Sequence, residues 1–259
     1  MKRGASSVLR FIAMLAVCTL ALQLVFAVRI AAMRFIDPQS TSFQRSEIWR
    51  LLVEKHRIEW SQKWVPGTQI SPNLKRAVIA SEDAGFVEHS GVEWDALEKA
   101  WERNQKAEAR VAKINERVER QAAKPNARPL VKPPVEPKIV GGSTITQQLA
   151  KNLFLAGERN LPRKAQEFII TFLLESILNK SRILEIYLNN VEWGEGLFGA
   201  EAAAHHYFHV SAAQLSPISA ARLAVMLPAP KRFEKRPDSP YVASRAGTVA
   251  ARMSAVEVP

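Results

Sequence analysis

The sequence predicts a mainly α-helical protein with one membrane-spanning helix near its N-terminus. Three observations support this fold class. Residues 11–28 form an apolar run without a charged residue. Much of the remaining chain places apolar residues at helical spacing behind Ser, Thr or Asn helix-start signals. No stretch alternates apolar and polar residues for long enough to indicate a sheet.

The first 70 residues are organised around that apolar run. As a helix, residues 11–28 would be about 27 Å long, close to the thickness of the hydrocarbon core. A cleaved signal peptide is the alternative, but the run is long for one and no small-x-small cleavage site follows it. Basic residues flank both ends, so the positive-inside rule gives only weak support to a cytoplasmic N-terminus. We predict a cytoplasmic segment over residues 1–10, a transmembrane signal anchor over 11–28 and a membrane-proximal segment over 29–70.

Length and charge narrow the classes of function. The chain of 259 residues is long enough for an anchor and one sizeable core. Its net charge of +11 suits nucleic acid, an anionic membrane or a phosphate-bearing substrate. Nucleic acid ranks last because no recognition motif accompanies the charge. Cys18 is the one cysteine, so no intrachain disulfide can form. The histidines at 205, 206 and 209 lack a carboxylate or thiol at ligand spacing, which disfavours a metal site there.

A helix is predicted to start at Ser71-Pro72, because serine is a good N-cap and proline suits the first turn. Leu74 and Val78 form its apolar stripe, and Glu82 is the next position on that stripe. Burial of a carboxylate costs free energy unless it is paired or protonated, and it raises the pKa. Such a group can serve as a general acid or base. By geometry alone, a salt bridge from Glu82 to a lysine or arginine is the more common outcome.

The stretch from Gly141 to Asn152 predicts another helix start. Thr144 and Gln147 have capping-box spacing, and an apolar stripe follows at every fourth residue. On a helical wheel Gln147 and Lys151 project to the opposite side. A glycine-rich approach, free amide groups and a lysine one turn later are favourable for binding an anion. An ordinary capped surface helix is the alternative that these features alone favour.

The next helix carries a charged face. Residues 160–162 are a helix-start signal, and Arg163, Lys164 and Glu167 then share one face at i, i+3 and i+4 spacing. A local Arg163–Glu167 ion pair is the simplest interpretation. Residues 168–178 are apolar almost all round, which predicts a central, buried helix.

The last third of the chain is predicted to be helices joined by loops. Ser181 is predicted to cap the short helix that follows it. The glycines at 194, 196 and 199 are predicted to make the next loop flexible. From Pro237 onward the chain is polar and less patterned.

Residues 93–122 form a predicted helix dense with charges of both signs. A solvated helix with i,i+4 ion pairs is the usual structure of such a sequence. Prolines at 125, 129, 133, 134 and 137 then indicate an extended or disordered linker. Little of this segment is suited to burial in a core.

Five strings stand out in order, at residues 82–91, 141–152, 163–167, 180–189 and 220–230. The first reads Glu-Asp-x-x-Phe-x-x-His-x-Gly, the third Arg-Lys-x-x-Glu, and the fourth Lys-x-x-Ile-Leu-Glu-x-Tyr-Leu-Asn. Together they resemble the signature motifs of the peptidoglycan glycosyltransferases, glycosyltransferase family 51, and within it the monofunctional biosynthetic transglycosylases. Arg222 departs from the fifth motif, where a smaller or apolar residue is expected. The strings extend over nearly the whole soluble part of the chain.

The resemblance implies a mainly α, lysozyme-like fold with a large lobe and a small jaw lobe. The glycosyltransferase domain would span 71–245, with the jaw or insertion at about 101–138 and a C-terminal tail at 246–259. Bifunctional relatives add a transpeptidase. This sequence contains no Ser-x-x-Lys and no Lys-Thr-Gly, so we expect no transpeptidase activity.

The implied reaction polymerises lipid II into glycan strands. Transfer from a glycan on undecaprenyl pyrophosphate to the 4-hydroxyl of lipid II would invert the anomeric centre. The resemblance makes Glu82 the catalytic base and Glu167 the second catalytic residue, with Glu167 also the place for a divalent cation, Mg²⁺ or Mn²⁺. No organic cofactor is expected. The residues that the resemblance assigns to substrate binding are Asp83, Phe86, His89, Ser143, Thr144, Gln147, Gln148, Lys151, Asn152, Arg159, Arg163, Lys164, Lys180, Glu185, Tyr187 and Asn189.

The implied location is the bacterial inner, or cytoplasmic, membrane, with a single pass and the catalytic domain in the periplasm. The expected partners are lipid II, the undecaprenyl-pyrophosphate-linked glycan, the membrane and other cell-wall synthesis proteins, with no nucleic acid. Two alternatives stay open. One is a lysozyme-like enzyme that cleaves glycan, and the other is a non-catalytic, membrane-anchored scaffold. The two glutamates and several cations argue against the scaffold.

Overall fold

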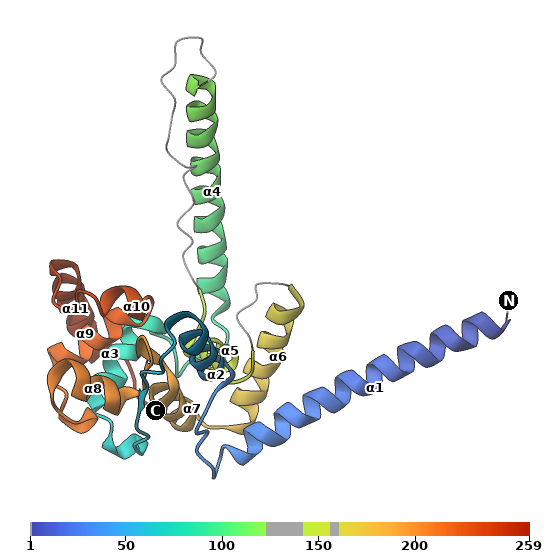
Figure 1. Ribbon diagram of the computed structural model, residues 1–259, viewed down its shortest axis with the longest axis horizontal. Coiled ribbons are helices and arrows are strands. Elements are labelled where there is room, and N and C mark those ends of the chain that lie inside the picture. The colour runs from blue at the N-terminus through green and yellow to red at the C-terminus, as the bar shows by residue number, and fades with distance from the viewer. Residues whose placement is uncertain (1, 123–141, 156–160) are drawn as a thin grey trace. The chain divides into compact units, whose positions relative to one another are not determined.

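The structure is a computed structural model that describes residues 2–122, 142–155 and 161–259 (Figure 1). Helices dominate these residues, as the sequence predicts. The chain divides into two compact units, a large one made of residues 1–91 with 144–259 and a small one of residues 92–143.

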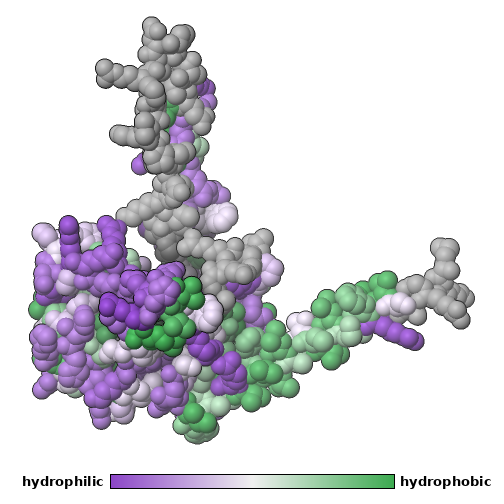
Figure 2. Space-filling model, in the orientation of Figure 1, coloured by the Kyte–Doolittle hydropathy of each residue, from purple (hydrophilic) through white to green (hydrophobic). Residues whose placement is uncertain are grey.

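The predicted anchor is one continuous helix, α1 (Lys2–Ala32). The segment of this helix from Ser7 to Ala32 is long and apolar enough to cross a membrane. Figure 2 shows apolar residues along this helix, and most of their side chains are exposed. Near its C-terminal end the helix packs against α6, and Ile30 is fully buried. The side-chain amides of Gln23 and Gln166 exchange hydrogen bonds of 2.9 Å in each direction.

The rest of the large unit is a set of short helices around one core. Helix α3 packs against α9 and α11, and α5 packs against α2, α6 and α7. The largest buried side chains in the core are Trp193, Tyr187 and Phe86. The helices are α2 (Ser42–Arg50), α3 (Pro72–Glu82), α5 (Ile145–Phe154), α6 (Leu161–Ile177), α7 (Lys180–Asn190), α8 (Ala200–Phe208), α9 (Pro217–Met226), α10 (Pro230–Phe233) and α11 (Pro240–Arg252), with a π-helical turn at Leu51–Lys55 and 3-10 turns at Gly67–Gln69, Ala212–Gln214 and Met253–Ala255.

A small sheet was not predicted. Its order is β1 (Ser61–Gln62), β3 (Leu197–Phe198) and β2 (Glu192–Gly194), with β1 parallel and β2 antiparallel to β3. Strands of two or three residues are too short to show an alternating pattern in sequence. The prediction of a flexible glycine loop is also wrong, because Gly196 is buried at a φ of +71°. A Cβ there would lie 2.0 Å from the Glu59 carbonyl oxygen, so glycine permits a tight turn.

One helix boundary differs from the prediction, and one predicted domain boundary falls inside a helix. The N-cap of α7 is Asn179, whose side chain accepts a hydrogen bond from the Arg182 amide at 2.8 Å, whereas Ser181 lies inside the helix. Helix α11 continues through residue 245, the predicted end of the glycosyltransferase domain. Its buried side chains are Val242, Ala246 and Val249, whose three- and four-residue spacing outweighs the polar composition around them.

The small unit contains α4 (Trp94–Ala122). Most of its side chains are exposed, and Lys106 pairs with Glu102 at 3.4 Å across one turn. This matches the predicted solvated helix. The proline-rich segment lies outside the described residues.

Candidate active site

Glu82 is the last residue of α3 and its side chain is half-buried. Glu82 Oε2 accepts a hydrogen bond from Gln148 Nε2 at 3.0 Å, and Gln148 Oε1 accepts one from the Tyr187 hydroxyl at 2.9 Å. Among the described residues, no lysine or arginine forms an ion pair with Glu82, so its burial is not compensated by a cation. The salt bridge considered from the sequence is not what the structure shows.

Burial sets the protonation of this cluster. It raises the pKa of Glu82, the hydrogen bond from Gln148 opposes the rise, and the neighbouring Asp83 charge adds to it. Burial also raises the pKa of Tyr187 well above its ordinary value, helped by the charges of Glu82 and Asp83. Tyr187 therefore keeps its proton at neutral pH and donates to Gln148. Gln148 in turn donates to Glu82, which is the final acceptor.

Asp83 is buried at the N-terminus of α5. Asp83 Oδ2 accepts a hydrogen bond from the backbone amide of Ile145, the first residue of that helix, at 3.0 Å. Asp83 Oδ1 lies 2.8 Å from His89 Nε2. The backbone amide of Gly91 donates to His89 Nδ1 at 3.1 Å, so the Nε2 atom carries the proton toward Asp83. The first amide of α5 is thus satisfied by the chain's own carboxylate.

Thr144 and Gln147 form the predicted capping box of α5. The Thr144 hydroxyl also donates to the Gly91 carbonyl at 2.6 Å, which ties the loop after Asp83 to this helix. Gln147 is therefore buried, although the helical wheel places it on the side opposite the apolar stripe. Both residues hold the backbone in place, and only Gln148 of this turn reaches Glu82.

Gly91 lets helix α6 approach that loop closely. Its φ is +86°, and a Cβ there would lie 2.7 Å from Thr171 Cγ2 and 2.8 Å from Glu175 Cγ. Glu167, Thr171 and Glu175 are spaced by four residues along α6, so they share one face of the helix. Thr171 and Glu175 show that this face points at the loop.

Glu167 is buried one turn before Thr171. Lys164 Nζ is in close contact with Glu167 Oε1, and Arg163 Nη1 lies 3.5 Å from Glu167 Oε2. The predicted Arg163–Glu167 pair is thus present, with Lys164 as a second partner. The three residues place two half-buried cations at the start of α6.

Lys180 contacts several parts of the site at once. Its Nζ donates to Glu175 Oε1 at 2.8 Å and to the His89 carbonyl at 2.7 Å, and it lies 4.6 Å from the centroid of the Phe86 ring. Thr146 Oγ1 donates to the same Glu175 oxygen at 2.6 Å. Phe86 itself is fully buried. Lys180 and Phe86 therefore support the loop that carries Asp83 and His89.

Glu185 and Asn189 of α7 do not share the contacts that Tyr187 makes with Gln148. Glu185 pairs with Arg182 at 2.9 Å. Asn189 is fully buried and makes two hydrogen bonds to the backbone of Val65, at 2.9 and 3.0 Å. Neither side chain contacts the Glu82 cluster within the described residues, and Asn189 fixes the segment before α3.

Four of the residues predicted to bind substrate remain. Lys151 is exposed and Asn152 half-buried, both on α5. Ser143 belongs to the small unit. Arg159 lies outside the described residues.

Comparison with known proteins decides the family. A family model described as transglycosylase matches residues 51–113 and 130–254. A biosynthetic peptidoglycan transglycosylase from Paraburkholderia xenovorans (strain LB400) is 47% identical over 95% of this chain and 91% of its own length. The chain belongs to the transglycosylase family. Biosynthetic peptidoglycan transglycosylases from Burkholderia thailandensis and Burkholderia pseudomallei are 49% and 48% identical over 93% of this chain and 83% of theirs.

The match confirms the resemblance seen in the motifs. It begins at residue 51, before the predicted domain start at 71, and ends at residue 254. The interruption between residues 113 and 130 falls inside the segment that we treated as an insertion in this transglycosylase.

Glu167 is a poor metal ligand in this transglycosylase. One of its carboxylate oxygens contacts Lys164, and the other faces Arg163. Among the described residues, it belongs to no cluster of three groups that could ligate an ion. A divalent cation at Glu167 would be repelled by two positive side chains, so the residues present do not fit one.

Sequence reasoning missed Glu175 and Thr146. Both belong to the hydrogen-bonded cluster around Lys180, and Glu175 is nearly buried. A signal was available, because Glu175 is the one carboxylate in the apolar part of α6 and lies two turns from Glu167 on the same face. A charged residue in a buried helix usually has a partner, which here is Lys180.

Proposed function

We propose that this chain is a peptidoglycan glycosyltransferase that polymerises lipid II by inverting transfer from an undecaprenyl-pyrophosphate-linked glycan. Its family and the names of its relatives support the reaction class. One observation carries the assignment of the base. Glu82 is a half-buried carboxylate that has hydrogen-bond donors beside it and, among the described residues, no cation partner.

The reaction needs a single displacement. Glu82 accepts the proton of the 4-hydroxyl of lipid II as that oxygen attacks the anomeric carbon of the donor. The bond from this carbon to the pyrophosphate breaks, and the pyrophosphate leaves with the electron pair. An α-linked donor then gives a β-linked product, and no covalent enzyme intermediate is required. The raised pKa strengthens Glu82 as a base toward a sugar hydroxyl.

The leaving pyrophosphate needs charge neutralisation, which cations and a helix N-terminus supply. Arg163 and Lys164 lie in the first turn of α6, and Glu167 fixes both side chains. Lys151 is an exposed cation on the neighbouring α5. We assign pyrophosphate binding to these three cations. We assign Lys180 to positioning, because Glu175 and the His89 carbonyl hold its ammonium group.

A lysozyme-like cleavage is the second candidate. That reaction uses a second carboxylic acid to protonate the leaving oxygen. Glu167 is poorly placed for this role because Lys164 and Arg163 face its two oxygens. The geometry therefore favours transfer from a pyrophosphate, which needs no protonation to leave.

We propose that α1 anchors the enzyme in the bacterial inner membrane, with the catalytic domain in the periplasm. Other cell-wall synthesis proteins are its expected neighbours there. The substrate carries a polyprenyl tail and stays in the bilayer, so an anchored enzyme meets it at a raised local concentration.

Incubation of the purified full-length chain with fluorescent lipid II tests this proposal. We expect a ladder of glycan products that lysozyme digests. Release of soluble sugars from finished peptidoglycan, without a ladder, would instead support the glycan-cleaving enzyme. A folded chain with neither activity would support the scaffold.

A further inference from the structure

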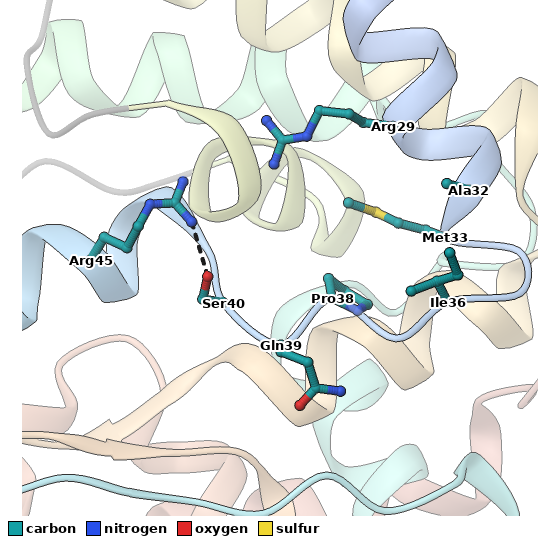
Figure 3. A pocket seen from close by; sticks show the side chains of 8 residues that line it. All are labelled: Arg29, Ala32, Met33, Ile36, Pro38, Gln39, Ser40 and Arg45. Carbon is teal, nitrogen blue, oxygen red and sulfur yellow. Dashed lines mark hydrogen bonds between the residues drawn. The ribbon is translucent and has the colours of Figure 1, made fainter.

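A pocket of about 320 Å³ lies where α1 ends and α2 begins (Figure 3). Arg29 reaches it from α1, and Arg45 reaches it from α2 on the opposite side. The other lining residues are apolar or uncharged: Ala32, Met33, Ile36, Pro38, Gln39 and Ser40. This volume is at the lower end of the range for small-molecule sites.

The pocket is positively charged, and no acidic residue lines it. Arg45 donates to Ser40 Oγ at 3.0 Å and to Ser42 Oγ at 3.1 Å. The Arg29 guanidinium lies 4.8 Å from the centroid of the Phe154 ring. Neither arginine forms an ion pair within the described part of the chain. Two guanidinium groups that flank one pocket and keep donor capacity are suited to a phosphate group.

The end of α1 does not oppose an anion. The last carbonyl groups of a helix carry partial negative charge, which would repel one. Here Arg182 contacts the turn that follows α1, with Nε donating to the Met33 carbonyl at 2.8 Å and Nη2 to the Ile36 carbonyl at 3.3 Å. Asp37, the acidic residue next to the pocket lining, pairs with Arg182 at 2.7 Å. Arg182 thus neutralises Asp37, while the last carbonyl groups of α1 accept hydrogen bonds from the backbone amides of residues 33–36.

The pocket lies at the depth of the lipid headgroups. Arg29 is the first charged residue after the run 11–28, whose helix of about 27 Å matches the hydrocarbon core. Phe35 and Ile36 follow it with 88% and 65% of their surface exposed, as expected for apolar groups at an interface. We propose that the pocket binds the headgroup phosphate of an anionic phospholipid. A bound lipid would join α1 to α2 and restrict the movement of the anchor relative to α2.

This inference rests on α1 acting as the proposed anchor, and it does not depend on glycosyl transfer. The test uses the full-length chain in mixed phosphatidylglycerol and phosphatidylcholine micelles. Native mass spectrometry counts the lipids that stay bound. The variants are Arg29→Gln, Arg45→Gln and their combination. Arg34→Gln is the matched control, because Arg34 is an exposed arginine near the same helix end that does not line the pocket.

We expect the natural chain to retain one phosphatidylglycerol in preference to phosphatidylcholine. Each pocket variant should weaken that preference roughly fivefold, and the double variant about 30-fold, whereas Arg34→Gln should stay near the natural value. Arg45→Lys, which keeps the charge, should recover most of the loss. Equal retention by the double variant and the control would overturn the proposal, as would no preference in the natural chain.

Inorganic phosphate separates a lipid site from a small-anion site. Displacement of the retained lipid by millimolar phosphate would overturn the lipid assignment. Thermal melts confirm that the variants are folded. Failure of the natural chain to float with vesicles of either lipid would refute the anchor. Lack of polymer in the lipid II assay, with lipid retention unchanged, would refute only the proposed function.

Discussion

At the scale of single residues, neighbouring groups shift the pKa of Glu82 in opposite directions. Burial and the charge of Asp83 raise its pKa, while the amide of Gln148 stabilises the carboxylate. Catalysis requires the ionised form, so activity should fall as the pH drops through this raised pKa. The acid limb therefore lies above the ordinary glutamate value of about 4.3.

Replacement of Gln148 by leucine should move that limb to higher pH. The variant removes the one side-chain amide that stabilises the Glu82 carboxylate, and a hydrogen bond of about 0.5–1.5 kcal/mol corresponds to roughly 0.4–1 pH unit. The measurement is the rate of lipid II polymerisation against pH. Gln69→Leu is the control, because Gln69 is exposed. An unchanged acid limb in Gln148→Leu would show that this contact does not influence the base.

Asp83 should be a positioning residue. Its carboxylate accepts hydrogen bonds from the Ile145 amide and from His89. Asp83→Asn supplies only one acceptor oxygen and should cost about 1–3 kcal/mol of stability, with a loss of activity as the loop shifts. Thermal melts in detergent and polymerisation rates test this. Glu88→Gln, on the exposed side of the same loop, should match the natural chain in both; an equal loss there would contradict the assignment.

The sequence predicted the burial of Glu82 because helical spacing is a local property. It could not predict that Asp83 would bind the amide of Ile145, which is 62 residues away. The anion site at the start of α5 was predicted from local features. The fold shows that the anion at this helix start is the Asp83 carboxylate. Glu175 was missed for a similar reason, since its partners Thr146 and Lys180 come from different helices.

At the scale of elements, the helices were predicted better than the connections. Cap residues and apolar stripes located α3, α5 and α6, because both act within a few residues. The small sheet depends on pairing between Ser61 and Leu197, which no local pattern reveals. Helix α11 was hidden by its polar composition until its contacts with α9 and α3 showed its buried face.

Helix α1 is both the proposed anchor and a packed element. Ile30 and Met33 at its end are buried, and the Phe26 ring meets Phe154 edge-on with centroids 5.3 Å apart. Removal of residues 1–34 should therefore lower the thermal stability, because each buried side chain of this size contributes about 1.5–3 kcal/mol. Removal of residues 1–21 should not, because this packed end is kept. Equal melting temperatures for the two truncations in detergent would contradict the packing.

At the scale of the whole molecule, the chain combines a large unit that holds the Glu82 cluster with a small, charged one. Replacement of Asn104 to Pro137 by a short Gly/Ser loop should leave the melting temperature nearly unchanged, because most described side chains of α4 from residue 101 onward are exposed. Calorimetry of both chains in detergent measures this. A large loss of stability would show that the segment contributes to the core.

The central claim is that Glu82 is the base of a glycosyl transfer. The most direct test is the initial rate at which purified Glu82→Gln consumes lipid II, beside the natural chain and Glu88→Gln. General-base assistance contributes roughly 10²–10⁴ in rate, so we predict a loss of at least 100-fold for Glu82→Gln, with an unchanged melt, and near-natural rates for Glu88→Gln. Near-full activity in Glu82→Gln, or inactivity that comes only from unfolding, would contradict the account.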